Sequence, residues 1–458
     1  MDTNRFASRI MSAFRWVTTS DLRALFLLFV VALLLRVPFI THPPVTEFDE
    51  VVYVDYSIAM LSGTPFIDIH PPLARMLFSE AARGSVPQTT PMLLLTVSRQ
   101  FEGFPFERVR MLMILIGSLL PLAVYLTGRA LLYTPRMALL IGLFVAFDNA
   151  LIIYSRVILP DMMLLVFHFL ALGLTFLSIG TTHTTRRRIF MLLAALSIGC
   201  ALSIKWTALG MFGLVLLIFI VWRRFSAAIV VATIALLVYV GIFMLSLMIY
   251  FPHGGISQNN FPTPQGIIWN THIAFPDTKN FGAVLRFIPA YTRAMYQMNY
   301  DPLVLSQGSV AQAPSSWPLG DNYIVFWSSP DRSATIHVTG NRALWVFTFL
   351  AFLFNLVWIS CRAIKKLPLN ITKTEVLLIT GYAANYLPFF LLARPMYIYH
   401  YFTALIMLVI LLPIILPRIN ATLVSVTKDS MFSSALLFLG ALIIFADALF
   451  LLPTTYGF

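Results

Sequence analysis

Residues 22–40 read LRALFLLFVVALLLRVPFI, and this apolar run is followed by FDE at 48–50 and IDIHPPL at 67–73. A run of this kind crosses a bilayer as one helix, because about 20 apolar residues cover the hydrocarbon core. The chain has only 19 acidic residues, yet eight of them follow this run closely: Glu47, Asp49, Glu50, Asp55, Asp68, Glu80, Glu102 and Glu107. Neighbouring carboxylates at a membrane surface repel each other and lose hydration, so they mark a candidate functional site.

The composition predicts an all-α polytopic membrane protein. The 458 residues are 59% hydrophobic and have a mean hydropathy of +0.85, which lies far outside the range of soluble proteins. Eleven apolar runs can be read as spans: 22–40, 111–132, 136–154, 160–179, 189–204, 207–222, 226–250, 342–360, 374–393, 401–417 and 431–452. The fifth and sixth are the shortest and could form one broken segment.

The placement of Lys and Arg predicts the orientation of these spans. If the N-terminus is cytoplasmic, most cations fall in inside segments, and the short outside turns hold only Arg156, Lys205 and Arg394. The C-terminus then lies outside, and the first run is a retained signal anchor. The net charge of +12 is therefore expected to meet anionic lipid, and the chain lacks the basic polar domain of a nucleic-acid binder.

We expect three parts along the chain. Residues 1–250 form an N-terminal transmembrane module with a first outer loop at about 41–110, in which 73–82 has helical periodicity and could lie in the membrane interface. Residues 251–341 form a large outer loop with short helices, and 342–458 form a four-helix transmembrane part. Both loops face one side, so a reaction site is expected between them and the helix ends.

Two acidic motifs carry the first candidate site residues. Asp49 and Glu50 suit a general base and a group that positions it, although an interfacial cap or a salt bridge to an arginine is an alternative. Asp68 and His70 precede two prolines that fix the backbone and start a helix at Leu73. The alternative for this second motif is turn chemistry with a surface histidine.

A third group surrounds the turn between the third and fourth runs. Asp148 is predicted inside a span, where a carboxylate needs a partner. Arg156 and Asp161 follow it, and they could either form a structural clasp with each other or contact a substrate.

Three cations are predicted at the outer ends of helices: Arg110, Lys205 and Arg394. Phosphate binding explains three cations at one depth better than three separate anchors do, because guanidinium groups donate in pairs to phosphate oxygens. Lys205 precedes Trp206 and could hold a phosphate beside the indole, or it could extend its amine to the interface. The aromatic run around Tyr399 could be an interfacial belt.

Taken together, six motifs resemble the signatures of the protein O-mannosyltransferase family, a GT-C class of membrane glycosyltransferases. They occur in order along most of the chain: Phe48-Asp49-Glu50-Val51, IDIHPPL at 67–73, Phe147-Asp148-Asn149-Ala150 with SRVILPD at 155–161, Ser203-Ile204-Lys205-Trp206, Ser316-Trp317-Pro318-Leu319, and Asn385-Tyr386-Leu387-Pro388 with Arg394 and YIYHYF at 397–402. The resemblance implies a GT-C fold of about 11 transmembrane helices with two large outer loops.

The resemblance also implies an activity, which is the inverting transfer of mannose from a polyprenyl phosphate to Ser or Thr of a protein at the outer face. Asp49 would be the base, Glu50 would orient acceptor or sugar, and Arg110 and Arg394, with Lys205, would stabilise the departing phosphate. Further residues would line or support the site: Tyr399, His400, Asp68, His70, Asp148, Arg156, Asp161 and Trp206. Fixed cations can neutralise a phosphate, so no metal or other cofactor is expected, although a divalent ion is left open.

Some positions depart from the family pattern. Val52-Tyr53 stands where the family commonly has a histidine, and Pro160 replaces the usual leucine. The loop at 251–341 is too short for the β-trefoil domain that fungal and animal members insert. This favours a bacterial-type member in the plasma (inner) membrane, with polyprenyl-phosphate-mannose and a secreted or membrane protein as its partners and an association with the secretion machinery left open.

Two other functions stay open from the residues. A relative of the same fold could move a lipid-linked sugar to a lipid or glycan, as the aminoarabinose transferases do. A secondary transporter would show inverted repeats and charges at mid-membrane. No repeat is visible, and the charges gather toward one face.

Overall fold

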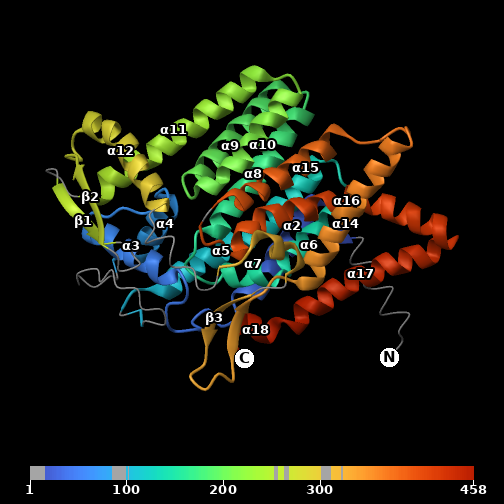
Figure 1. The fold of residues 1–458 in the computed structure, drawn as a ribbon, viewed down its shortest axis with the longest axis horizontal. Helices are drawn as coiled ribbons and strands as arrows, with labels where there is room; N and C mark the ends of the chain where they lie inside the picture. Colours follow the sequence, from blue (N-terminus) through green and yellow to red (C-terminus); the bar gives the residue numbers. More distant parts are fainter. Residues whose placement is uncertain are drawn as a thin grey trace.

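The computed structural model describes residues 16–84, 100–101, 103–251, 256–262, 268–300, 311–320, 323–392 and 394–458, with the backbone alone described in the strands between 256 and 272. The described chain is mostly helical, and shorter helices and two β-hairpins lie at the edges of a bundle of long helices (Figure 1).

The first half of the bundle is built around one central helix, α8 (Asp161–Gly180), which packs against α5, α9 and α10. Its other helical elements are α2 (Asp21–Arg36), α5 (Phe106–Ala130), α6 (Pro135–Ala146), α7 (Asn149–Tyr154), α9 (Thr184–Leu202), the 3-10 turn η1 (Trp206–Ala208), α10 (Leu209–Val221) and α11 (Phe225–Tyr250). Helices α9, α10 and α11 contact one another and form one group in Figure 1.

The second half adds α14 (Arg342–Ile364), α15 (Lys373–Ala384), the 3-10 turns η3 (Leu387–Leu391) and η4 (Ile398–Tyr401), α16 (Phe402–Thr427), α17 (Ser430–Phe450) and α18 (Leu452–Tyr456). Helix α16 packs against α14, α15 and α17, and its first part, residues 402–412, is buried. The short α18 contacts α7 and strand β4 (Thr335–Val338), which brings the C-terminal end beside the second predicted outer loop.

Each of the eleven predicted apolar runs contains a helix, but only part of them are long spans. Within the described residues, six helical segments are long and apolar enough to cross a membrane: α5, α8, α11, α14, Ile398–Thr427 and α17. The run 136–154 breaks because the Asp148 carboxylate caps α7 by accepting from the Leu151 amide at 3.0 Å. The run 374–393 leaves the α-helical form near Pro388, which has no amide hydrogen to donate.

The first loop contains two helices that pack on each other, α3 (Glu50–Ser62) and α4 (Leu73–Ala82). The bounds of α4 match the predicted helix. Its buried positions include Ala74, Phe78 and Ala82, spaced by four residues along one face. Because α4 also contacts α5 and α11, this face packs against protein.

The second loop differs from the prediction of short helices alone. It holds the antiparallel pairs β1 (Ile256–Pro262) with β2 (Ile268–Phe275) and β3 (Ile324–Ser328) with β4, the turn η2 (Pro314–Leu319), and the 19-residue helix α12 (Phe281–Asn299). Helix α12 buries Val284, Ile288, Tyr291 and Met295 at helical spacing against α11. Hydropathy did not predict this amphipathic helix, because the segment is polar in composition and contains Pro289.

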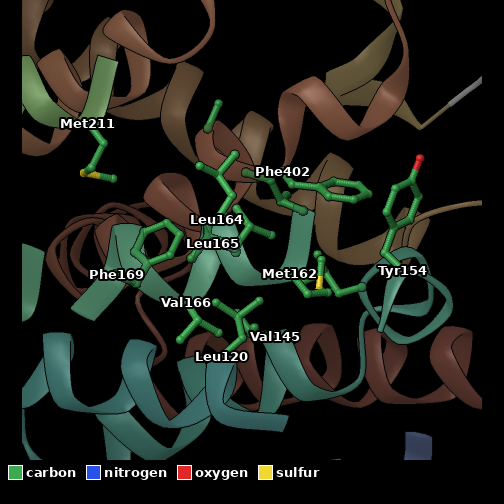
Figure 2. Packing of buried hydrophobic residues seen from close by; sticks show 14 of the residues in the cluster. Leu120, Val145, Tyr154, Met162, Leu164, Leu165, Val166, Phe169, Met211 and Phe402 are labelled. Carbon is green, nitrogen blue, oxygen red and sulfur yellow. The ribbon is translucent and has the colours of Figure 1, made fainter. Parts of the chain in front are cut away.

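The core lies where α8 meets its neighbours. Figure 2 shows Leu164, Leu165 and Phe169 of α8 together with Met211 of α10 and Phe402 of α16, in one apolar cluster. Each of these side chains is buried. The N-terminus of α8 is thereby fixed relative to the C-terminal half of the chain, and this is the end that carries Asp161.

Candidate active site

The predicted base, Asp49, stands at the N-terminus of α3. Phe48 before it has a positive φ of 50°, which turns the chain into the helix, and the Asp49 side chain does not cap the helix. Among the described residues no hydrogen-bond donor engages this carboxylate, and the residue is partly exposed where it lines a cavity. Burial raises the pKa of Asp49 to about 6; Asp161 also raises the pKa, while Lys205 and Arg394 lower it.

Glu50 is fully buried and is engaged on both oxygens. The guanidinium of Arg110 donates to it from Nε at 3.0 Å and from Nη2 at 2.8 Å, and the amide of Ile158 donates at 3.0 Å. This contact ties the start of α3 to α5 and to the segment between α7 and α8. For Glu50, the structure therefore agrees with the alternative prediction of a salt bridge to an arginine.

Arg110 was predicted to bind phosphate, and its contacts in the structure contradict this prediction. Its other N–H groups donate to the carbonyls of Pro43 at 2.8 Å, Ile40 at 3.3 Å and Val45 at 3.4 Å, so all five guanidinium hydrogens are used. The side chain is fully buried, and its guanidinium carbon lies 5.1 Å from the centre of the Phe101 ring and 5.0 Å from that of the Phe106 ring. A guanidinium in this state has no N–H left for a phosphate.

The other two predicted cations do line cavities. Lys205 Nζ donates to Asp161 Oδ1 at 2.8 Å and lies 4.7 Å from the centre of the Tyr399 ring. Arg394 donates to Asn299 Oδ1 at 2.5 Å at the end of α12. Both cations act on the pKa of Asp49, so they belong to the electrostatic surroundings of the base.

The clasp of Arg156 with Asp161 was a wrong alternative. Asp161 pairs with Lys205, and Arg156 donates to the carbonyls of Pro38 at 2.9 Å and Phe39 at 2.8 Å. A further bond joins Arg156 to the Thr455 carbonyl at 3.3 Å. Arg156 therefore fastens α18 and the end of the first helix to the bundle, away from the cavity linings.

Asp148 has the partner that its burial requires. Besides capping α7, its carboxylate accepts from the Trp345 indole at 2.6 Å and from the Asn341 amide at 3.1 Å. These contacts join α7 to the start of α14. Asp148 is thus a link between the two halves of the chain and lies outside the cavity linings described below.

Asp68 and His70 lie on the same cavity as Asp49, which has about 370 Å³ of empty space and is also lined by Tyr53. Arg75 of α4 forms an ion pair with Asp68 and donates to the His70 carbonyl at 2.9 Å. Burial holds the pKa of His70 well below its ordinary value, with Lys205, Arg394 and His400 acting in the same direction. The imidazole is therefore neutral at physiological pH.

The C-terminal signature closes the site from the other side. The Tyr399 ring stacks on His400 at 4.3 Å between centroids and meets Phe48 edge-on at 6.4 Å. Trp317 of η2 is fully buried and stacks against His400 at 6.1 Å. These aromatic contacts bring segments from the first loop, the second loop and the last helices to one place.

A second cavity and a groove meet beside Lys205. The cavity, with about 380 Å³ of empty space, is lined by Asp161, Lys205, Tyr399 and His400 among others. The groove has about 1040 Å³ of empty space, mostly apolar walls, and Arg394 and Trp206 in its lining. Both share the same three residues, Thr207, Asn385 and Phe389, so a polar head and an apolar chain of one molecule could occupy them together.

Several lining residues escaped the sequence reading. Asn299 comes from the unpredicted α12, and Asn385 lies in a quoted motif without an assigned role. The sequence motifs gave no role to Arg75, yet it forms an ion pair with Asp68, which lines the Asp49 cavity. Arg75 follows Asp68 by seven residues, with two prolines between them, and this spacing does not predict a contact. The described residues contain no group of three or more His, Cys, Asp or Glu side chains placed to hold a metal ion.

Comparison with known proteins agrees with this architecture. A sequence model described as "Dolichyl-phosphate-mannose-protein mannosyltransferase" matches residues 26–252, and one for the "C-terminal four TMM region of protein-O-mannosyltransferase" matches residues 288–458. The chain belongs to the protein O-mannosyltransferase family. Its members are glycosyltransferases of the GT-C class, and the predicted fold class is thus confirmed.

Curated family members align with a part of the chain. Protein O-mannosyl-transferase 1 of Homo sapiens is 31% identical over 153 residues, which are 31% of this chain and 20% of that protein. Dolichyl-phosphate-mannose–protein mannosyltransferase 1 of Schizosaccharomyces pombe is 30% identical over 207 residues, 42% of this chain and 22% of that protein. The chain thus spans about a fifth of the length of these relatives.

Solved structures share the fold over nearly the whole chain. The Saccharomyces cerevisiae Pmt1-Pmt2 complex bound to the sugar donor gives a TM-score of 0.75 with 14% identity, covering 97% of this chain and 92% of that one. ArnT from Cupriavidus metallidurans bound to undecaprenyl phosphate gives 0.53 with 14% identity, covering 97% and 77%. At these identities the likeness concerns the fold.

Proposed function

We propose that this chain transfers mannose from a polyprenyl-phosphate-linked donor to Ser or Thr hydroxyl groups of a protein, with inversion at the sugar carbon and Asp49 as general base. The observation that carries the proposal is the Asp49 carboxylate, which accepts no hydrogen bond from the described residues and lies on a cavity whose electrostatic surroundings include Lys205 and Arg394. Family membership supports the donor class and the protein acceptor.

The donor phosphate is proposed to bind between Lys205 and Arg394. Lys205 lines the polar cavity, two residues before Thr207, which the cavity shares with the apolar groove, and Arg394 lines the groove. The polyprenyl chain would occupy the groove between η1, α12 and η3, where Leu209, Pro388 and Leu392 supply apolar surface. Tyr399 and His400 would then line the space around the phosphate.

The chemical step needs a base and a stabilised leaving group. Asp49 takes the proton from the acceptor hydroxyl while its oxygen attacks the anomeric carbon, and the bond from that carbon to the phosphate oxygen breaks with its electron pair on the phosphate. The phosphate diester becomes a monoester and gains negative charge. Lys205 and Arg394, fixed beforehand by Asp161 and Asn299, stabilise that charge as it develops.

Glu50 and Arg110 are proposed to position the base. Their buried contact fixes the start of α3, so that Asp49 keeps one place relative to α8 and Lys205. Asp68 and Arg75 would do the same for the loop that carries His70. These four residues would act through Asp49 and the cavity wall, and they need not contact the reacting atoms.

We also propose the predicted orientation, with a cytoplasmic N-terminus, the Asp49 cavity on the extracytoplasmic side of the plasma membrane, and a secreted or membrane protein as acceptor. The short outside turns of the topology prediction contain Lys205 and Arg394, which agrees with a site on that side. The yeast structure is of a two-protein complex, and a partner subunit for this chain is an open proposal on the same ground.

The test is an assay of the purified full chain with radiolabelled polyprenyl-phosphate-mannose and a Ser/Thr peptide. We expect labelled peptide from the parental chain, none when the peptide carries Ala at each Ser and Thr, and no product from Asp49→Asn. Label transferred to a lipid or glycan but not to the peptide would instead establish the alternative acceptor. Asp49→Asn that transfers at the parental rate would refute the base assignment.

A further inference from the structure

The end of the bundle that lies away from Asp49 carries a separate basic cavity. It has about 840 Å³ of empty space, and its lining includes four arginines: Arg187, Arg188, Arg223 and Arg224. None of the described residues that line it is acidic. The rest of the lining is small or apolar, including Met191, Phe219, Ala227 and Val230.

Helix directions place this arginine cavity far from the proposed active site. Helix α8 begins with Asp161 at that site and ends at Gly180, two residues after Ser178 of the arginine cavity. A helix of 20 residues is about 30 Å long. Helix α10 likewise runs from Leu209 on the apolar groove to the turn that holds Arg223. The two cavities therefore lie at opposite ends of α8 and α10.

Backbone carbonyls anchor one of the four arginines. Arg224 donates to the carbonyls of Ser178 at 3.0 Å and Ile179 at 3.2 Å, which anchors it at the end of α8. Arg223 adopts a positive φ of 56° in the turn before α11. Arg187 and Arg224 line the same cavity, where like charges repel. Burial lowers the pKa of Arg224, and the charge of Arg187 lowers it further.

Charges held together in this way gain from an anion that bridges them. Two arginines elsewhere in the bundle have an acidic partner: Arg129 pairs with Asp21 at 2.8 Å, and Arg418 pairs with Glu375. For Arg187, Arg188, Arg223 and Arg224, no ion pair is found among the described residues. The cavity also opens beside exposed apolar side chains that would face lipid, among them Ile189, Phe225 and Ile229.

We propose that this arginine cavity binds the phosphate headgroup of an anionic phospholipid. The guanidinium groups would hold the phosphate oxygens, and the acyl chains would run along the apolar surface of α9 and α11. The combination of a basic cavity and flanking lipid-facing side chains favours a lipid over a free phosphate, which would use only the arginines. The site is distinct from the donor site, and its ligand takes no part in sugar transfer.

The experiment compares lipid binding by the full chain in phosphatidylcholine vesicles with and without phosphatidylglycerol. The variant Arg187→Gln/Arg223→Gln removes two cavity charges, and Arg136→Gln/Arg186→Gln removes two exposed cationic charges that are absent from the described lining. Native mass spectrometry counts retained phosphatidylglycerol, and thermal unfolding measures its stabilising effect.

We expect phosphatidylglycerol to raise Tm of the parental chain and of the control, and to bind about 30-fold more weakly to the cavity variant. Both variants should transfer sugar at the parental rate, which also shows that they are folded. Equal lipid retention by the two variants would overturn the proposal. So would stabilisation by inorganic phosphate without any effect of phosphatidylglycerol. A failure of sugar transfer in every chain would bear on the proposed function and not on this site.

Discussion

Two neighbouring regions at the start of α3 use the same kinds of side chain in opposite ways. In the closed region, Glu50 and Arg110 are fully buried and every guanidinium hydrogen has an acceptor. In the open region, Asp49 lines a cavity, and Lys205 lies on a second cavity with one carboxylate partner. The difference teaches that saturation of hydrogen bonds, more than charge, separates a residue that holds the site from one that can meet a substrate.

The largest expected effect comes from the open region. Asp49→Asn removes the only proton acceptor proposed for the acceptor hydroxyl, so we expect transfer to fall by about 10²–10⁴-fold. The amide has nearly the same shape, and the carboxylate makes no described hydrogen bond, so the thermal unfolding midpoint should stay close to the parental value. Transfer assays and unfolding curves on the same preparation measure both. A large loss of stability would show that Asp49 has a structural role like that of Glu50 and Arg110.

The closed region should respond in stability. Arg110→Met leaves the Glu50 carboxylate buried without its ion partner, and we expect a loss of about 3–5 kcal/mol in the free energy of unfolding. Chemical denaturation in detergent measures it. The matched control is Arg83→Met, which breaks an exposed pair with Glu80 in the same loop and should cost less than about 1 kcal/mol. Equal losses in both variants would contradict the comparison.

Lys205→Met should affect both regions, because Lys205 lines a cavity and also forms a buried ion pair with Asp161. The variant removes a cation from the proposed phosphate site, and we expect kcat/KM for the lipid donor to fall by about 10²-fold, as for loss of one stabilising donor. Because it also leaves Asp161 without its partner, Asp161→Asn/Lys205→Met serves as the second variant. Donor kinetics at saturating peptide measure the effect. Parental kinetics in the double variant would show that Lys205 belongs with the structural ion pairs.

The smallest expected effect is a pH dependence. The pKa of Asp49 is raised to about 6, and the base acts in its deprotonated form. Transfer should therefore be constant above that pKa and fall about tenfold per pH unit below it. A kcat/KM profile of the parental chain measures the midpoint. His70→Gln should leave the midpoint nearly unchanged, because His70 is already neutral there; a large shift in this variant would assign the titration to the histidine.

Much of the fold followed from hydropathy, and the exceptions have local causes. All eleven apolar runs contain helix, and α4 has its predicted bounds, because apolar length and helical spacing report burial directly. The break at Asp148 and the helix α12 were missed. The first depends on a buried cap that also contacts Trp345, and the second on an amphipathic face that needs α11 to cover it.

The sequence predicted many of the residues of the candidate site, but only some of their roles. The sequence placed Asp49, Lys205 and Arg394 near helix ends, and the structure relates all three through the charge on Asp49. It also suggested Arg110 as a phosphate ligand and Arg156 as the partner of Asp161, and the structure gives both arginines other acceptors. Charge and position were visible along the chain, whereas the acceptors are carbonyls from distant segments such as Pro43 and Thr455.

By itself, the sequence determined a membrane-embedded helical chain with its scarce acids concentrated after the first helix, since bilayer thickness and the cost of charge in lipid act on every residue locally. Only the tertiary structure decided that Glu50 pairs with Arg110 and Asp161 with Lys205, leaving Asp49 open to a cavity. The reason is geometric. An ion pair or a cavity forms between segments that are far apart in the chain, and the packing of α3, α5 and α8 sets which groups meet.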